Sequence, residues 1–337
     1  MRLTFLIGNG FDLNLGLKTK YEHFLPIYCG SPSPRVRNQE IPQFKKLLEN
    51  DSLYTLWADF ERALGAFTAV PPLHQQRSLR ICLQDFKQSF AQYLQAQENQ
   101  IDFDSCAAAM ADRFFSDLVS YLDYVEPHIR NTIRRNILNE FPKSCSILNF
   151  NYTTILDRLL PFLNTEDPKR DSIQNMIHVH GTHSSGMMMG VDNIDQVANP
   201  DLFTHPLQRR LLLKPLLNQQ SGPDNDYNAS RCIERSDTIC VFGMSLGETD
   251  MIWWQRIGQW LSGSARHQLL IFARSPYLNP LFFEDILDCQ NAVQDLFFSR
   301  TDIPQEQRET LRDQVHVALN SVIFHLEPTL IPSRHSR

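Results

Sequence analysis

The segment His178-Val179-His180-Gly181 contains side chains that can do chemistry near neutral pH. Residues two apart share a face of a strand, so His178 and His180 have a spacing that allows metal chelation. His180 alone can also act as a general base, because an imidazole titrates near neutral pH. Gly181 lets a ligand approach the backbone, which favours His180 over His178 and His183 as the functional residue. A buried, hydrogen-bonded core histidine is the alternative.

A glycine turn, Gly8-Asn9-Gly10, follows an apolar run at the start of the chain. The two glycines allow a sharp turn and the close approach of a ligand. Backbone N–H groups there, with the N-terminus of a following helix, favour anions such as pyrophosphate. Leu13 occupies the last place of G-x-G-x-x-G, so the dinucleotide pattern is incomplete. The turn predicts part of a nucleotide pocket, with an ordinary tight turn as the alternative.

Polar residues also follow other predicted strands. Asn151 carries a carboxamide that can position a ribose hydroxyl or an attacking water, or can cap the next helix. Gly243-Met244-Ser245 ends another strand with residues suited to holding a phosphate, and Asp250 after it is either a ligand contact or a helix N-cap. Asp192 can contact a ligand too, although an Asp-Asn pair is typical of turns.

The elements that must position these residues follow an α/β pattern. Short apolar runs predict buried strands at residues 3–7, 144–150, 176–180, 186–191, 238–243, 268–272 and 322–326. Helical patterns alternate with them, which predicts a Rossmann-like, doubly wound parallel sheet. The carboxyl ends of parallel strands share one edge of the sheet, so we expect the polar segments to meet in one crevice there.

Residues from about 41 to 139 show helical periodicity and almost no glycine after Gly65. We therefore expect a single α/β domain over residues 1–337 with a large helical insertion at residues 35–142. Within the insertion, Trp57 is expected in the core, and Glu61 is expected to be exposed or to cap a helix.

Bulk composition excludes several classes of protein. The 337 residues carry a net charge of −6, which provides no general attraction to nucleic acids or acidic membranes. Seven scattered cysteines without a CxxC pair indicate reduced thiols, not a disulfide framework or a zinc ribbon. The N-terminal apolar run is too short for a signal peptide, and no run of about 18 apolar residues occurs. We expect a cytoplasmic protein that does not enter membranes.

Six separated segments between residue 3 and about residue 260 form an ordered pattern. They are Ile7-Gly8-Asn9-Gly10-Phe11-Asp12 with Gly16-Leu17-Lys18-Thr19, Tyr21 and Phe24; Trp57-x-x-Phe60-Glu61; Asn149-Phe150-Asn151-Tyr152-Thr153; His178-Val179-His180-Gly181; Gly190-Val191-Asp192; and Gly243-x-Ser245-Leu246-Gly247-x-x-Asp250. This pattern resembles the AbiH family of bacterial phage abortive infection proteins. The resemblance implies a role in anti-phage defence, with a phage-derived trigger, an antitoxin protein or a second copy of the chain open as partners.

The AbiH family is similar, more distantly, to sirtuin-like NAD-binding proteins, in which an asparagine and a histidine flank the nicotinamide ribose. By position the resemblance implies that Asn151 and His180 are catalytic and that NAD is the substrate of a glycohydrolase. The implied nucleotide-binding residues are Gly8, Asn9, Gly10, Asp12, Tyr21, Gly181, Asp192, Gly243, Ser245 and Asp250. The zinc-binding cysteines of deacetylating sirtuins have no counterpart here, so neither lysine deacetylation nor a metal is expected.

Asp12 departs from the sirtuin pattern, which has a serine at this place. A carboxylate repels a nearby pyrophosphate, so either Asp12 turns away to cap a helix or hold a hydroxyl, or the ligand is not NAD. Two other functions stay open. One is metal-dependent hydrolysis of a nucleotide or nucleic acid by His178, His180, Asp12 and Asp192, although the acidic net charge disfavours nucleic acid. The other is a non-catalytic nucleotide sensor or toxin–antitoxin partner that uses the helical insertion as its interaction surface.

Overall fold

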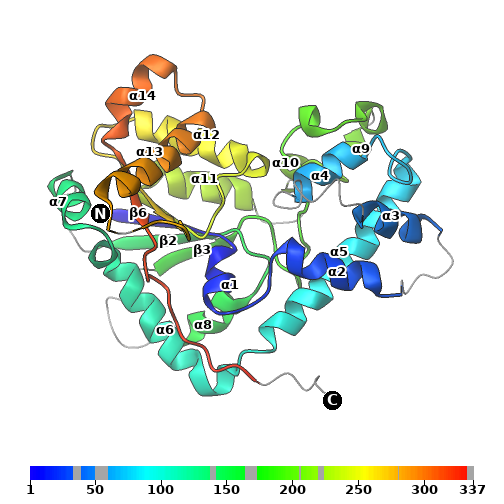
Figure 1. Cartoon of the computed structure of the whole chain (residues 1–337), viewed down its shortest axis with the longest axis horizontal. Coiled ribbons are helices and arrows are strands. Elements are labelled where there is room, and N and C mark those ends of the chain that lie inside the picture. Colours follow the sequence, from blue (N-terminus) through cyan, green and yellow to red (C-terminus); the bar gives the residue numbers. More distant parts are fainter. Residues whose placement is uncertain are drawn as a thin grey trace.

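The computed structural model describes residues 1–32, 39–49, 60–136, 142–163, 173–204, 206–218, 224–279 and 281–331. Within these ranges six strands form one parallel sheet (Figure 1). They are β1 (Arg2–Ile7), β2 (Ser144–Asn149), β3 (Ile173–His178), β4 (Thr238–Phe242), β5 (Gln268–Ala273) and β6 (Val315–Leu319). In the order β3-β2-β1-β4-β5-β6, successive strands are added on one side of β1 up to β3 and on its other side from β4 onward, so the strand order switches between β1 and β4. The predicted Rossmann-like α/β class is confirmed, while its likeness to sirtuins stays a prediction.

Two of the predicted strands are wrong. In residues 186–191 the structure has a loop, where Val191 forms an isolated bridge with Leu213. The last strand is Val315–Leu319, not residues 322–326. The polar residue His316 interrupts the apolar pattern of this strand in the sequence. Its ring is nevertheless buried, because it contacts Gln268 Oε1 at 2.8 Å.

One predicted strand is displaced along the chain. Strand β3 covers residues 173–178, not 176–180, so His180 lies two residues beyond its end. His178 and His180 therefore do not share a strand face, as their spacing had suggested. The loop position leaves the His180 side chain free to point along the carboxyl edge of the sheet instead of into a face.

Alternate side chains of β1 divide the sheet into two apolar faces. Leu3, Phe5 and Ile7 pack into one core cluster, and Leu6 packs into another. The first cluster is covered by α6 (Phe103–Val119), η2 (Tyr121–Tyr124), α7 (Pro127–Asn136) and α8 (Ile155–Leu163). The second is covered by α11 (Asn225–Arg235), α12 (Met251–Ser262) and α13 (Phe283–Ser299).

A third apolar cluster forms a helical lobe beside the sheet, on the right of Figure 1. It contains side chains of α2 (Tyr21–Gly30), α3 (Glu40–Leu48), α4 (Phe60–Phe67) and α5 (Gln76–Glu98), and of residues 187–216. The helices between β1 and β2 thus divide between this lobe and one face of the sheet. Trp57 lies outside the described residues.

Shorter helical elements complete the described fold. They are α1 (Gly10–Asn14), η4 (Ile194–Gln196), η5 (Pro200–Phe203), α9 (Pro206–Arg209), α10 (Lys214–Asn218), η6 (Glu248–Asp250) and α14 (Gln305–Arg312). In the part of the chain that the structure describes, no helix has the length and apolar character needed to cross a bilayer.

The turns after β1 and β4 pack directly against each other. The Gly8 N–H donates to Phe242 O (2.9 Å), and the Gly10 N–H donates to Gly243 O (2.8 Å). A Cβ atom added at Gly10 would lie 2.4 Å from the Gly243 Cα, and Gly243 itself has a φ of 69°. Both glycines are therefore required by the contact between the two turns, at the point where the strand order reverses.

We expect Gly10→Ala to lower the free energy of unfolding by about 1–3 kcal/mol or more, because the added methyl group meets backbone atoms that cannot rotate away. Gly30→Ala is the matched control, since a Cβ atom there meets nothing within 4 Å. Urea unfolding of both variants measures the difference. Equal stabilities for the two variants would contradict the contact.

Candidate functional site

The polar segments lie along one edge of the sheet, after the carboxyl ends of β3, β2, β1 and β4. Backbone hydrogen bonds connect these ends in order. Val179 N–H donates to Asn149 O (2.9 Å), and Phe150 N–H donates to Ile7 O (2.8 Å). The contact between the turns after β1 and β4 continues the series to Gly243. The structure thus brings the predicted segments together at the sheet edge, as in other open α/β sheets.

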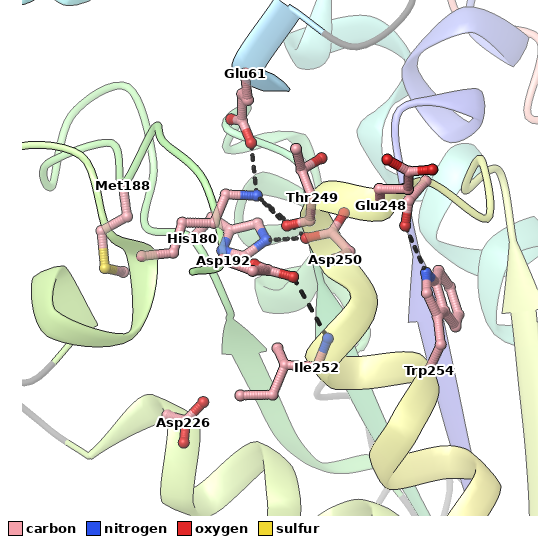
Figure 2. Close-up of polar contacts among 12 residues, drawn as sticks. Glu61, His180, Met188, Asp192, Asp226, Glu248, Thr249, Asp250, Ile252 and Trp254 are labelled. Atoms are coloured by element: carbon pink, nitrogen blue, oxygen red, sulfur yellow. Dashed lines mark hydrogen bonds and ion pairs between the residues drawn. The ribbon is translucent and has the colours of Figure 1, made fainter. Parts of the chain in front are cut away.

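His180 is buried, and its two ring nitrogens have different surroundings (Figure 2). Nε2 lies 2.8 Å from Asp250 Oδ1, whereas the buried Nδ1 has no hydrogen-bond partner in the described structure. A carboxylate only accepts, so Nε2 carries the proton and Nδ1 keeps its lone pair. The Phe150 ring packs edge-on against the imidazole at 5.3 Å between centroids. Nδ1 is therefore the ring nitrogen that is available to accept a hydrogen bond.

Lys214, the first residue of α10, joins three segments around this histidine and is only 3% exposed. Its ammonium lies 2.5 Å from Glu61 Oε2, 2.9 Å from Thr249 O and 3.2 Å from Asp250 Oδ1. All three ammonium hydrogens thus have acceptors. Burial alone would lower the pKa of Lys214, but Asp250 and Glu61 hold it above its usual value.

Asp250 is consequently ionised. Burial by itself would raise the pKa of Asp250, yet Lys214 and His180 together hold it below its usual range. Its position just before α12 had suggested a helix N-cap, but no side-chain cap is formed there. Asp250 instead accepts from His180 Nε2, which fixes the proton of the neutral imidazole on that nitrogen.

Glu61, in α4, is buried, and the expectation of an exposed or capping residue is wrong. The carboxylate can be buried because it accepts from Lys214 and from the hydroxyl of Tyr152 (2.8 Å to Oε1). Tyr21, an expected nucleotide contact, also reaches Glu61 Oε1 at 3.4 Å and packs on Phe60 at 4.8 Å between ring centroids. These contacts connect the helical lobe to the sheet edge.

Asp192 is a third carboxyl group near Lys214. Its Oδ2 accepts from the Ile252 N–H at 3.4 Å, in the first turn of α12. Burial raises the pKa of Asp192 to about 7, Lys214 opposes this shift, and Asp250 adds to it. Asp192 thus lies at the same cluster as His180, as predicted for a site residue.

Asn151 is 4% exposed and follows β2. Its N–H donates to Asn149 Oδ1 (3.0 Å), while its own buried Oδ1 has no hydrogen-bond partner among the described residues. It does not cap α8, which begins four residues later at Ile155. Buried polar atoms without partners are uncommon in folded proteins, and Asn151 Oδ1 and His180 Nδ1 are both available to accept hydrogen bonds from a ligand.

Asp12 turns away from the glycine turn and into the protein. It is buried, and Thr153 Oγ1 donates to its carboxyl group at 3.0 Å from each oxygen. Burial raises the pKa of Asp12 to about 8, the Thr153 hydrogen bond opposes the shift, and nearby Glu98 adds to it. Of the roles weighed for Asp12, the structure shows the one in which it holds a hydroxyl, that of Thr153, and its contact with a nucleotide stays a prediction.

The glycine turn is built differently from an anion cradle. The N–H groups of Gly8, Gly10 and Phe11 all donate to protein carbonyls, and Asn9 Oδ1 accepts from Thr19. Gly181 likewise serves the chain itself, because a Cβ atom there would lie 2.2 Å from Gly186 O at a φ of 71°. These glycines permit contacts between loops, and the approach of a ligand to them stays a prediction.

The two remaining predictions concern Ser245 and a metal. Ser245 is exposed beside Gly243, and its carbonyl accepts from Gly247 N–H. His178 Nε2 pairs with Asp157 Oδ2 (2.8 Å) and His180 with Asp250, so the two histidines have different partners. The described residues hold no group of three or more His, Cys, Asp or Glu arranged for a metal ion.

Sequence reasoning missed Lys214 and Tyr152 and misplaced Glu61. A signal for Lys214 exists in the sequence, because it is a single charge within Leu211-Leu212-Leu213-Lys214-Pro215-Leu216-Leu217. An apolar run of that kind predicts burial, and a buried lysine requires carboxylate partners. The sequence does not say which carboxylates these are.

A family model described as "Bacteriophage abortive infection AbiH" matches residues 4–272 of this chain. The matched span begins in β1 and ends in β5, so it includes the whole sheet-edge cluster. None of the curated proteins compared with the chain matches it.

We expect Lys214→Met to destabilise the fold by about 3–5 kcal/mol, because it leaves Glu61 and Asp250 buried without a cation. Lys20→Met is the control, since Lys20 pairs with Glu22 on the surface, where an ion pair contributes about 1 kcal/mol or less. Urea unfolding measures both. Adding Glu61→Gln to Lys214→Met should restore part of the loss; a Lys214→Met protein as stable as wild type would exclude the buried network.

Asp12 should make stability depend on pH. Its folded-state pKa of about 8 is raised above that of the unfolded chain, about 4, so its stabilising contribution is full below pH 4 and is lost as the pH rises through 8. Asp12→Asn should remove up to about 1.4 kcal/mol of this loss per pH unit. Melting temperatures from pH 5 to 9 test this, with the exposed Asp201→Asn as control. Parallel profiles for wild type and Asp12→Asn would contradict it.

Proposed function

The chain belongs to the AbiH family of bacteriophage abortive infection proteins, and we propose that it serves this role by hydrolysing the nicotinamide–ribose bond of NAD. The supporting observation is the pair of buried, unpartnered acceptors, His180 Nδ1 and Asn151 Oδ1. They follow β3 and β2, which are neighbours in the sheet. Both atoms accept hydrogen bonds from a water molecule or a ribose hydroxyl, the groups that such a reaction must position.

In the proposed reaction, the bond between the ribose C1′ and the nicotinamide nitrogen breaks, and nicotinamide leaves with the electron pair. A water oxygen forms the new bond to C1′, and its proton passes to His180 Nδ1. The products are nicotinamide and ADP-ribose, and one proton is released to solvent when the imidazolium returns to neutral. Asn151 Oδ1 orients the water or a ribose hydroxyl, and Asp250 stabilises the imidazolium through Nε2.

The charge of the cluster supports cleavage of a glycosidic bond. Glu61, Asp192 and Asp250 surround one ammonium, that of Lys214. Cleavage at C1′ proceeds through an oxocarbenium-like state that carries positive charge, which nearby carboxylates stabilise. Phosphoryl transfer requires cations directed at phosphate oxygens, whereas the ammonium of Lys214 is already bound by three protein acceptors.

Fewer residues than the resemblance implies are available to bind the phosphates of a nucleotide. The amides of Gly8, Gly10 and Phe11 are used within the protein, so the glycine turn contributes a wall of the crevice instead of phosphate ligands. The buried position of Asp12 removes the repulsion that a carboxylate in this turn would exert on a pyrophosphate.

The test is nicotinamide release from NAD by the purified full chain, alone and with lysate from phage-infected cells. We expect His180→Ala and Asn151→Ala to lower the rate, by about 10²–10⁴-fold for the histidine, since general bases contribute that much. His178→Ala is the matched control, because its partner is Asp157, and it should stay near wild type. Full activity of His180→Ala, or no release from wild type under either condition, would overturn the proposal; binding without release would indicate a nucleotide sensor.

A further inference from the structure

Asp192 differs from the other two carboxyl groups of the site in having no counter-ion. Lys214 is within 4 Å of Glu61 and Asp250, whereas Asp192 forms no ion pair within the described residues. Its Oδ2 accepts a long hydrogen bond from the Ile252 N–H, at 3.4 Å. The three ammonium hydrogens of Lys214 are already taken by other acceptors. One carboxyl group of the site is therefore left uncompensated.

The groups around the Asp192 carboxyl group favour the binding of a positive charge beside it. Lys214 in α10, Asp250 in η6, Glu61 in α4 and the N-terminus of α12 are the charged and polar groups that face it. Among them the carboxyl groups outnumber the ammonium, and burial raises the pKa of Asp192 to about 7. A cation that docks beside Asp192 favours its ionised form, which recovers part of the free energy spent on burying it.

The carboxyl group of Asp192 lies near His180, the residue that we propose as the general base. Its carboxyl group contacts Ile252, and Asp250, which holds His180, lies two residues earlier in the chain. Figure 2 shows Asp192, Asp250 and His180 in one cluster at the start of α12. A group placed for attack assisted by His180 Nδ1 thus lies close to Asp192.

We propose that Asp192 is a specificity-determining residue that recognises the positively charged pyridinium ring of an N-ribosyl pyridinium ligand. The inference rests on the proposed function for the identity of the ligand, NAD. It goes further in assigning the preference of the site to the charge of the ring. A carboxylate can also accept from a ribose hydroxyl, but that contact is the same in the oxidised and reduced ligands, because only the charge of the ring differs between them.

The experiment compares binding of the oxidised and reduced forms of carbocyclic NAD to the full chain by calorimetry. The carbocyclic ring prevents hydrolysis, so binding is measured whether or not the protein is an enzyme. At pH 8 wild type should bind the oxidised form about tenfold more tightly, or better, since one partly buried charge pair readily contributes this much. The preference should decline at pH 6, where Asp192 takes up a proton, because its pKa is about 7.

Asp192→Asn should bring the ratio of the two affinities close to one without loss of the fold, as judged by its melting temperature. Asp226→Asn is the control, because Asp226 is already neutralised by two hydrogen bonds from Arg256 (2.8 and 2.9 Å) and should leave the ratio unchanged. Equal binding of the two forms by wild type, a ratio unaffected by Asp192→Asn, or no binding of either form overturns the inference. Charge-selective binding without nicotinamide release from NAD would refute hydrolysis and leave this inference standing.

Discussion

The buried ammonium of Lys214 is the interaction on which the arrangement of this site depends. It joins Glu61 of the helical lobe to Thr249 and Asp250 at the start of α12, segments that are far apart in the sequence. Each charge alone would be expensive to remove from water, and the cluster is stable only because every member has partners. Tyr152 extends it to the loop after β2 by donating to Glu61. The lobe and the sheet edge are thus held in one geometry by electrostatics as well as by apolar packing.

That geometry determines what His180 can do. Since Lys214 keeps Asp250 ionised, Asp250 holds the imidazole by Nε2 and leaves Nδ1 as the acceptor. The Nδ1 atom of His178 is also buried without a partner, so what distinguishes His180 is its partner Asp250, which the Lys214 ammonium contacts. His178, two residues earlier, lies at the end of β3 and pairs with Asp157. The contrast between these two histidines arises from their position relative to the strand end, not from their sequence context.

The central strands of the sheet and the convergence of the polar segments at its edge could be predicted from the sequence. Apolar runs ending in glycine or asparagine predicted β1, β2 and β4, and an apolar run without such an ending predicted β5; the parallel pairing follows from the helices between these strands. The convergence of the Asn151, His180 and Asp250 segments at one edge follows from the same topology. The β6 strand was not predicted, because it contains a histidine, His316, whose burial depends on a hydrogen-bond partner on another strand, Gln268. The ion pair of Lys214 with Glu61 was not predicted for the same reason, because the burial of a charge depends on a partner that is distant in sequence.

The glycine turn shows how a correct motif can have a different physical basis. Gly8 and Gly10 do lie where the strand order reverses, which is where such sheets bind nucleotides. Here, however, the two glycines allow the turn to pack on Gly243, and their N–H groups are used in that contact. Two buried polar atoms without protein partners, Asn151 Oδ1 and His180 Nδ1, lie instead after β2 and β3, with the uncompensated Asp192 beside them. In this chain the available polar atoms at the sheet edge that we propose for chemistry therefore lie away from the first turn, on the segments that the Lys214 cluster positions.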